Sequence, residues 1–234
     1  MADYPLVMKA EGDGDFVVRC GMREETTPVL FFHMKCDSLG SSLLGYPEES
    51  GLYNIAYGSN HPASLISGKD SSAYRFKVGS TNYGICPITP AIDIAQSDFT
   101  VSFWGRSKSN SSSVVILNDN YSDGFVTIAI QGSTALFSMR KVSGGGNASI
   151  QPSIPLNKWR FITCVKKDQT IYIYISGVLK SSMSGVIYIP SATATDSYML
   201  NTPLPNGIDK DVDDVKMWKQ ALTEQQILDL YNSY

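Results

Sequence analysis

The chain has 234 residues, of which 43% are hydrophobic, so it contains enough apolar material for one large core and is not globally disordered. Its 19 lysine and arginine residues stand against 22 aspartate and glutamate residues, a net charge of -3. We expect no nucleic-acid partner, because there is no basic field to neutralise phosphates, and no membrane insertion, because no apolar run reaches ~18 residues.

Short runs rich in Val, Ile, Tyr, Phe and Thr alternate with clusters of Ser, Gly and Pro, a spacing typical of strands joined by turns. In chain order, the predicted strands are 16–20, 29–35, 73–78, 99–105, 114–117, 125–130, 135–141, 159–166, 170–175, 178–180 and 212–218. Along 99–105, Phe and Val alternate with Thr100, Ser102 and Trp104, which predicts a strand that is covered on both faces.

One helix is predicted at the end of this series. Thr223 is its expected N-cap, and Gln226 completes a capping box. Ile227, Leu230 and Tyr231 then share one helical face. Many short strands and one terminal helix predict an all-β fold, a two-sheet antiparallel jelly-roll sandwich, in a single domain over 1–234. Residues 1–28 are expected to form an N-terminal extension packed on it.

The four cysteines, Cys20, Cys36, Cys86 and Cys164, are widely spaced and contain no C-x-x-C pair, so we expect no zinc site. They are interpreted as buried free thiols. A Cys20–Cys36 bridge is the alternative in an oxidising compartment.

Four stretches carry more specific motifs. They are FFHMKCD at 31–37 with ESG at 49–51; GK at 68–69 with YRF at 74–76; DFTVSFW at 98–104; and the distributed set KWRF at 158–161, IYISG at 173–177, VDDVKMW at 212–218 and ALTEQQI at 221–227. In order and spacing they resemble the laminin G-like family of the concanavalin A-like lectin/glucanase superfamily over 29–231. This resemblance implies a concanavalin A-like sandwich. The chain departs from the family pattern at Ser176, where an acidic residue is usual.

Relatives in that superfamily include glycoside hydrolases, which need two carboxylates about 5–5.5 Å apart for a retaining reaction. The resemblance implies that such a pair would lie on an E-x-D-x-E strand. The chain has six glutamates, and none of them lies between Leu52 and Thr223. There is also no G-x-S-x-G motif, and His33 and His61 have no evident nucleophile partner. We therefore expect a protein that is not an enzyme.

The resemblance also implies a structural calcium ion near the acidic residues of the last strand. The candidate ligands are Asp213 and Asp37, with Asp214 behind them. Calcium takes ~6–8 oxygen ligands, many of them backbone carbonyls that a sequence does not reveal. The alternative is that one aspartate caps a turn and another forms a salt bridge with Lys216 or Lys35.

A sugar site needs aromatic faces together with amide and carboxylate groups. Tyr172 and Tyr174 point the same way on one predicted strand, and the favoured alternative to sugar binding is a cross-strand aromatic pair that covers the sheet. The preferred ligand loop is 118–123, whose alternative is an ordinary polar hairpin. The remaining candidate ligand residues are Asn118, Asn120, Tyr121, Asp123, Arg140 and Tyr198. Trp104, Trp159 and Trp218 match framework positions of the family and are expected in the core.

The function predicted from these patterns is a non-catalytic, lectin-like module that binds a glycan or a surface protein. The runner-up is a bacteriophage virion component, such as a tail or capsid decoration protein, which would also assemble into oligomers. A glycoside hydrolase is third. The first residues lack the regions of a signal peptide, so we expect cytoplasmic synthesis, with action in a virion or outside the cell.

Overall fold

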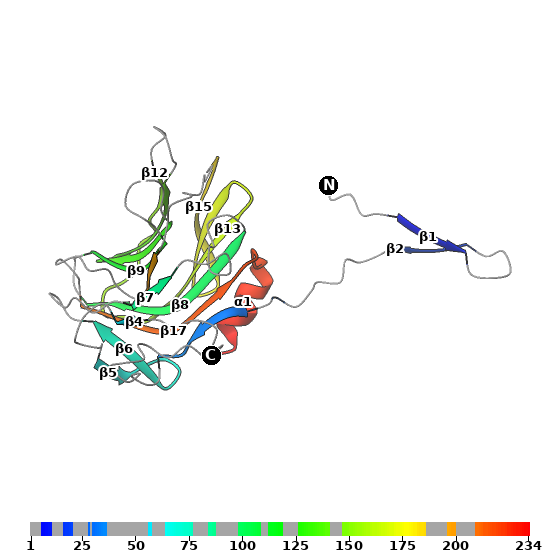
Figure 1. The fold of residues 1–234 in the computed structure, drawn as a ribbon. Helices are drawn as coiled ribbons and strands as arrows, with labels where there is room; N and C mark the ends of the chain where they lie inside the picture. Colours follow the sequence, from blue (N-terminus) through cyan, green and yellow to red (C-terminus); the bar gives the residue numbers. More distant parts are fainter. Residues whose placement is uncertain are drawn as a thin grey trace.

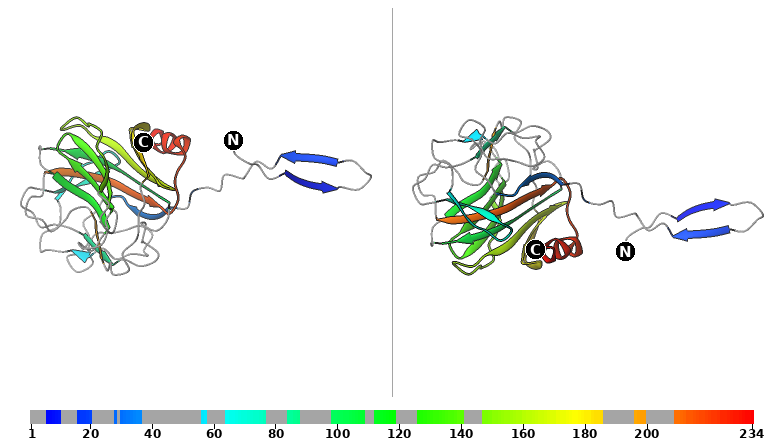
Figure 2. Two further views of the ribbon diagram at one scale, coloured as in Figure 1. Left: turned by 90° about the horizontal axis from the view of Figure 1, so that it is seen from above. Right: turned by 90° about the horizontal axis from the view of Figure 1, so that it is seen from below.

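The computed structural model describes residues 6–10, 16–20, 28, 30–36, 56–57, 64–76, 84–87, 98–108, 112–118, 126–140, 147–185, 196–199 and 209–234. Within these ranges, two antiparallel sheets face each other as a sandwich, and one helix lies on the outside of it (Figures 1 and 2). The predicted all-β sandwich with a short C-terminal helix is confirmed. No helix in the described ranges is long and apolar enough to cross a membrane.

The first sheet has eight strands, in the order β15-β14-β13-β8-β17-β6-β5, with β3 paired to the C-terminal half of β17. Its strands are β3 (Leu30–Met34), β5 (Ser64–Ser67), β6 (Ser72–Phe76), β8 (Phe99–Ser107), β13 (Arg160–Lys167), β14 (Thr170–Ile175), β15 (Val178–Ser184) and β17 (Lys210–Trp218). The central strand β17 therefore meets three different neighbours, which makes it the hub of this sheet.

The second sheet has seven strands, in the order β12-β11-β10-β9-β16-β7-β4. Its strands are β4 (Ala56–Tyr57), β7 (Gly84–Pro87), β9 (Ser112–Asn118), β10 (Val126–Gln131), β11 (Thr134–Arg140), β12 (Asn147–Ile150) and β16 (Asp196–Met199). A separate hairpin consists of β1 (Leu6–Ala10) and β2 (Phe16–Cys20). Figure 1 draws this hairpin away from the sheets, so its packing on the sandwich stays a prediction.

The main core lies between the two sheets. Phe99, Val101 and Phe103 point inward from β8, and the ring of Phe99 meets that of Phe137 edge-on at 5.9 Å. At Gly105 a Cβ atom would lie 2.5 Å from Cδ1 of Ile130 on the opposite sheet, so a larger residue there would require the Ile130 side chain to shift within the core. As predicted, β8 is covered on both faces, because Thr100, Ser102 and Trp104 on its outer face are buried as well.

The helix α1 (Glu224–Asn232) covers that outer face. Thr223 caps it, with both hydrogen bonds of the predicted capping box to Gln226. Ile227 is fully buried in a second apolar cluster, formed with Val165, Tyr174, Trp218 and Leu222. The predicted amphipathic helix therefore closes one part of the outer face of the eight-stranded sheet.

Two of the cysteines have described side chains, and both are buried. Cys164 is a free thiol inside the sandwich, and burial raises its pKa, so it remains protonated and unreactive. The sulfur of Cys36 donates a hydrogen bond to the backbone oxygen of Met34 at 3.6 Å. The side chains of Cys20 and Cys86 lie outside the described residues.

We predict that Ile227→Ala lowers the free energy of unfolding by about 2–4 kcal/mol, because it leaves a cavity under α1. Leu228→Ala, one residue along the same helix, is the matched control; Leu228 is 37% exposed, and its loss should cost under about 1 kcal/mol. Urea unfolding measures both values. Equal losses for the two variants would contradict the packing of α1 described above.

Candidate functional site

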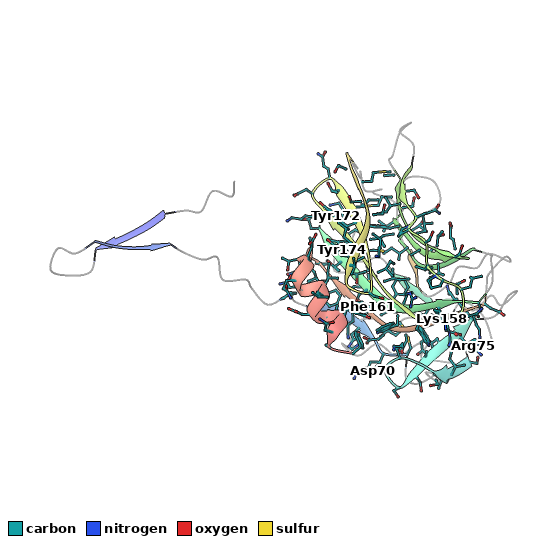
Figure 3. All side chains as sticks on the ribbon, turned by 180° about the vertical axis from the view of Figure 1, so that it is seen from behind. Asp70, Arg75, Lys158, Phe161, Tyr172 and Tyr174 are labelled. Carbon is teal, nitrogen blue, oxygen red and sulfur yellow. The ribbon has the colours of Figure 1, made fainter. Side chains whose placement is uncertain are left out.

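The outer face of the eight-stranded sheet divides into two parts. Near α1 it is apolar and covered by the helix. At the end away from α1 it carries charged side chains, and Figure 3 shows Arg75 and Lys158 there, on the far side of Phe161 from the helix. We describe this second part, the open end, as the candidate functional site.

The open end is built around Asp211, a fully buried carboxylate on β17. Strand register places Arg75 of β6 on one side of Asp211 and Arg106 of β8 on the other. Arg75 donates from Nε to Oδ1 at 2.8 Å and from Nη2 to Oδ2 at 3.1 Å. Arg106 donates from Nε to Oδ2 at 2.6 Å, and its Nη2 lies 2.6 Å from the same oxygen. Two guanidinium groups thus share one carboxylate, an arrangement we call the Arg75–Asp211–Arg106 row.

Trp159 extends this row toward β13. The guanidinium carbon of Arg106 lies 4.6 Å from the centre of the Trp159 ring, which is a cation–π contact. The neighbouring Lys158 is exposed, and Trp159 itself is only partly buried. The prediction that all three tryptophans are core residues is therefore accurate for Trp104 and Trp218, whereas Trp159 lies at the surface beside a cation.

The charges at the open end favour the binding of an anion. The hydrogen bond from Arg75 to Asp211 raises the pKa of Arg75 despite partial burial, so this side chain stays a cation at any physiological pH. Arg75 and Arg106 keep 27% and 22% of their side chains exposed. The row therefore presents two rigid cationic groups to solvent beside an aromatic ring.

Asp213 lies two residues after Asp211 on β17 and is also fully buried. Its Oδ2 accepts hydrogen bonds from the backbone N–H groups of Lys69, at 2.7 Å, and Asp70, at 3.1 Å, in the turn between β5 and β6. Gly68 is needed for this contact, because a Cβ atom there would lie 2.4 Å from Oδ2. Capping of a turn, one of the two roles set against calcium binding, is thus observed at Asp213.

Asp214 is the extra residue of a β-bulge, with φ of 48°. Its Oδ1 lies 2.5 Å from Nε2 of His33, its Oδ2 lies 2.7 Å from Nζ of Lys216, and the hydroxyl of Tyr234 donates to Oδ2. Burial raises the pKa of Asp214, but the hydrogen bonds from His33 and Lys216 outweigh this, so the pKa lies below its ordinary value. The predicted salt bridge to Lys216 is therefore present.

The predicted metal ligands do not form a cluster in the described residues. Both oxygens of Asp214 meet donors of the protein itself, and Asp37 lies outside the described ranges. Within those ranges, no three His, Cys, Asp or Glu side chains come together as a metal-binding group. The calcium prediction thus depends on Asp213 and Asp37.

The predicted sugar-binding tyrosines both pack beside α1. Tyr174 is 5% exposed, and Tyr172 is partly buried against the same cluster. Burial, with a smaller effect of Glu224, raises the pKa of Tyr174 to about 12. Of the two rings, only Tyr172 keeps much surface for a ligand, so their binding role stays a prediction.

The other predicted ligand residues fall outside what the structure describes. Asn118, Arg140 and Tyr198 have a described backbone, at the end of β9, the end of β11 and within β16, but no described side chain. Asn120, Tyr121 and Asp123 lie outside the described residues altogether. The predicted 118–123 ligand loop is therefore neither supported nor contradicted.

Sequence reasoning did not identify the Arg75–Asp211–Arg106 row. A signal was present at Arg75, which alternates with apolar residues along the predicted strand 73–78, whereas Arg106 and Asp211 lie just outside the predicted strands 99–105 and 212–218. However, β6, β8 and β17 are far apart in the chain, and only their pairing brings these residues together.

Comparison with known proteins supports the fold. A family model described as the concanavalin A-like lectin/glucanases superfamily matches residues 78–228, more than half of the chain. No curated protein matches the chain in sequence.

The chain also resembles solved structures of toxin binding domains. The binding domain of Paraclostridial Mosquitocidal Protein 1 is 20% identical, with a TM-score of 0.69, over 88% of this chain and 52% of that one. The receptor-binding domain of botulinum neurotoxin type G is 16% identical, with a TM-score of 0.65, over 89% and 51%. The binding domain of botulinum neurotoxin DC, solved with rat synaptotagmin II, is 19% identical, with a TM-score of 0.62, over 87% and 51%. The chain thus spans about half the length of these domains and shares their fold.

We predict that Asp214→Asn destabilises the protein by up to about 3 kcal/mol near pH 7, because it removes the anion that pairs with Lys216 and His33. Because the pKa of Asp214 is lower in the folded state than in the unfolded state, its ionised form stabilises the fold at pH values above the unfolded pKa of ~3.9. This stabilisation is lost as the pH falls through the lower pKa of the folded state. The difference in Tm between wild type and variant should therefore shrink between pH 5 and pH 2.5. A constant difference over that range would contradict the role given to Asp214.

Proposed function

We propose that this chain, which belongs to the concanavalin A-like lectin/glucanases superfamily, is a non-catalytic module that binds carbohydrate. The observation that carries the proposal is the open end, where Arg75, Arg106 and Trp159 are partly exposed beside one another on the outer face of the sheet. Arginine and tryptophan side chains of this kind dominate the energy of many recognition surfaces.

The likeness to toxin binding domains supports a recognition role in general terms. The domain of botulinum neurotoxin type G is a receptor-binding domain, and the domain of botulinum neurotoxin DC was solved with a protein, rat synaptotagmin II. Recognition of a surface protein is thus the wider form of the same proposal. The bacteriophage virion role stays a prediction from the sequence, since no feature of the described residues favours it.

The absence of catalysis is part of the proposal. At the open end, the buried carboxylate of Asp211 accepts hydrogen bonds from two arginines, so its oxygens are occupied by the protein rather than presented to a substrate. Among the described residues, Asp214 joins His33 to Lys216 and to the hydroxyl of Tyr234, which is a structural set of donors around one carboxylate. These arrangements suit a protein that uses its charges for structure and binding.

We further propose a structural calcium ion held by Asp213 and Asp37, with backbone carbonyls as the other ligands. The proposal starts from the buried carboxylate of Asp213 on the last strand, where the family resemblance implies the ion, and it adds calcium to the turn-capping contact that Oδ2 already makes. Calcium would supply a fixed positive charge that ties the last strand to this turn.

For the calcium ion, we predict that millimolar CaCl2 raises Tm and that excess EDTA reverses the rise. A ligand present at about a hundredfold over its Kd stabilises the folded state by about 2.7 kcal/mol. Asp213→Asn should abolish the response, and magnesium chloride at the same ionic strength serves as the control. Identical melting curves with calcium and with EDTA would rule out the site.

For carbohydrate binding, we predict that the labelled protein binds at least one glycan of a broad array with a millimolar or tighter Kd. Arg106→Ala should weaken this binding, because it removes both a charged donor and the stacking partner of Trp159. Tyr121→Ala tests the loop predicted from the sequence in the same assay. Binding lost only in Tyr121→Ala would move the site away from the open end, and no binding to any glycan would refute the lectin role.

A further inference from the structure

The open end has a chemistry that narrows the class of ligand. Its polar groups are two guanidinium groups fixed by a buried carboxylate, and its apolar surface is an indole ring. We propose that the Arg75–Asp211–Arg106 row, together with Trp159, binds the carboxylate-bearing ring of an acidic sugar, such as a uronic or sialic acid unit. This inference rests on the proposed glycan-binding function and deepens it.

The first step of the argument concerns the donors that remain on each arginine. A guanidinium has five N–H donors in a planar fork. Arg75 and Arg106 each direct Nε and Nη2 at Asp211. Among the described residues, Nη1 of neither side chain makes a hydrogen bond to Asp211. Arg75 and Arg106 keep 27% and 22% of their side chains exposed, so part of each side chain can meet an acceptor from solvent.

The second step concerns the cost of binding. A free arginine side chain loses up to ~2 kcal/mol of rotamer entropy when a ligand fixes it. Here Asp211 has already fixed both side chains, since it is fully buried and holds them at 2.6–3.1 Å. An anion arriving at this surface therefore meets preorganised donors, and more of the contact energy contributes to affinity.

The third step concerns charge. The chain as a whole has a net charge of -3, yet the open end holds Arg75 and Arg106 on either side of the one carboxylate of the row, and the exposed Lys158 directly precedes Trp159 in the chain. Asp209 lies close enough to affect Arg75 and reduces the local excess without reversing it. A cationic patch on an acidic protein steers anionic ligands to that patch.

The fourth step concerns the shape of the ligand. The fork of an arginine matches the planar carboxylate in a bidentate fashion, whereas a lysine acts as a point charge. The indole of Trp159 next to Arg106 offers apolar surface of the kind that packs against the C–H groups of a sugar ring. The two together favour a sugar that carries a carboxylate over a small inorganic anion or a neutral sugar.

The test measures Kd by calorimetry for two matched pairs of probes. The first pair is trigalacturonate and its methyl ester, and the second is sialyllactose and lactose. Each acid should bind at least about 10-fold more tightly than its neutral partner, because one charge-assisted hydrogen-bond pair is lost without the carboxylate. The pair with the greater ratio of neutral to acidic Kd shows whether the preferred ligand is a uronic acid or a sialic acid.

The variants are Arg75→Gln and Arg106→Gln, each expected to weaken binding of the acid about 10-fold. Lys180→Gln makes the same charge change at an exposed position on β15 and should leave Kd unchanged. Loss of an arginine leaves the buried carboxylate of Asp211 with fewer donors, which can destabilise the fold, so Tm is recorded for each variant. Arg75→Lys keeps a cation beside Asp211 but not the fork, and it should still lose affinity.

Several results would overturn the inference. Equal affinity for an acid and its neutral partner would overturn the inference and leave the lectin role intact. Stronger binding of a sulfated oligosaccharide than of either acid would have the same consequence. Full affinity in folded Arg75→Gln and Arg106→Gln would remove the row from the site. Failure of every glycan on the array, by contrast, would refute the proposed function itself.

Discussion

The structure depends on how β17 accommodates ionisable side chains in the interior. Lys210, Asp211, Asp213 and Asp214 are all buried on this central strand. A buried charge without partners costs several kcal/mol, so each carboxylate must receive donors from a neighbour. Those donors come from β6, β8, β3 and the turn after β5. Their positions are therefore coupled to the last strand of the chain.

The β-bulge makes this arrangement compatible with an apolar core. Between Asp213 and Lys216, β17 advances three residues while β8 advances two, from Trp104 to Ser102. In a regular strand without the bulge, strict alternation would place Val215 on the same face as Asp213 and would point Asp214 into the core. With it, Val212 and Val215 both enter the main core. The positive φ of Asp214 is the local cost of keeping two adjacent carboxylates out of the sandwich interior.

The sequence allowed the fold to be predicted because its signals are local. The alternation along 99–105 and the capping box at Thr223 each lie within a few residues, and both are observed. The open end could not be predicted in the same way, because its residues come from strands that are distant in the chain. Trp159 illustrates the limit, since it matches a framework position, and only the placement of Arg106 against its ring shows it to be a surface group. Turn capping by Asp213 and the salt bridge of Asp214 to Lys216 were both foreseen as alternatives to calcium binding. Which aspartate takes which role depends on the donors that the fold brings to it.

The two parts of the outer face show how one sheet can serve both stability and recognition. Near α1, burial of Ile227 and its neighbours stabilises the fold, and little surface is left for a ligand. At the open end, Asp211 weakens the positive field of its two arginines but also holds them in place. A patch of unpaired arginines would have a stronger field, yet it would lose side-chain entropy on every binding event. Because Asp211 is buried and its oxygens are already hydrogen-bonded, it competes little with an incoming acid for the arginine donors, so rigidity is gained at the cost of half of the row's positive charge.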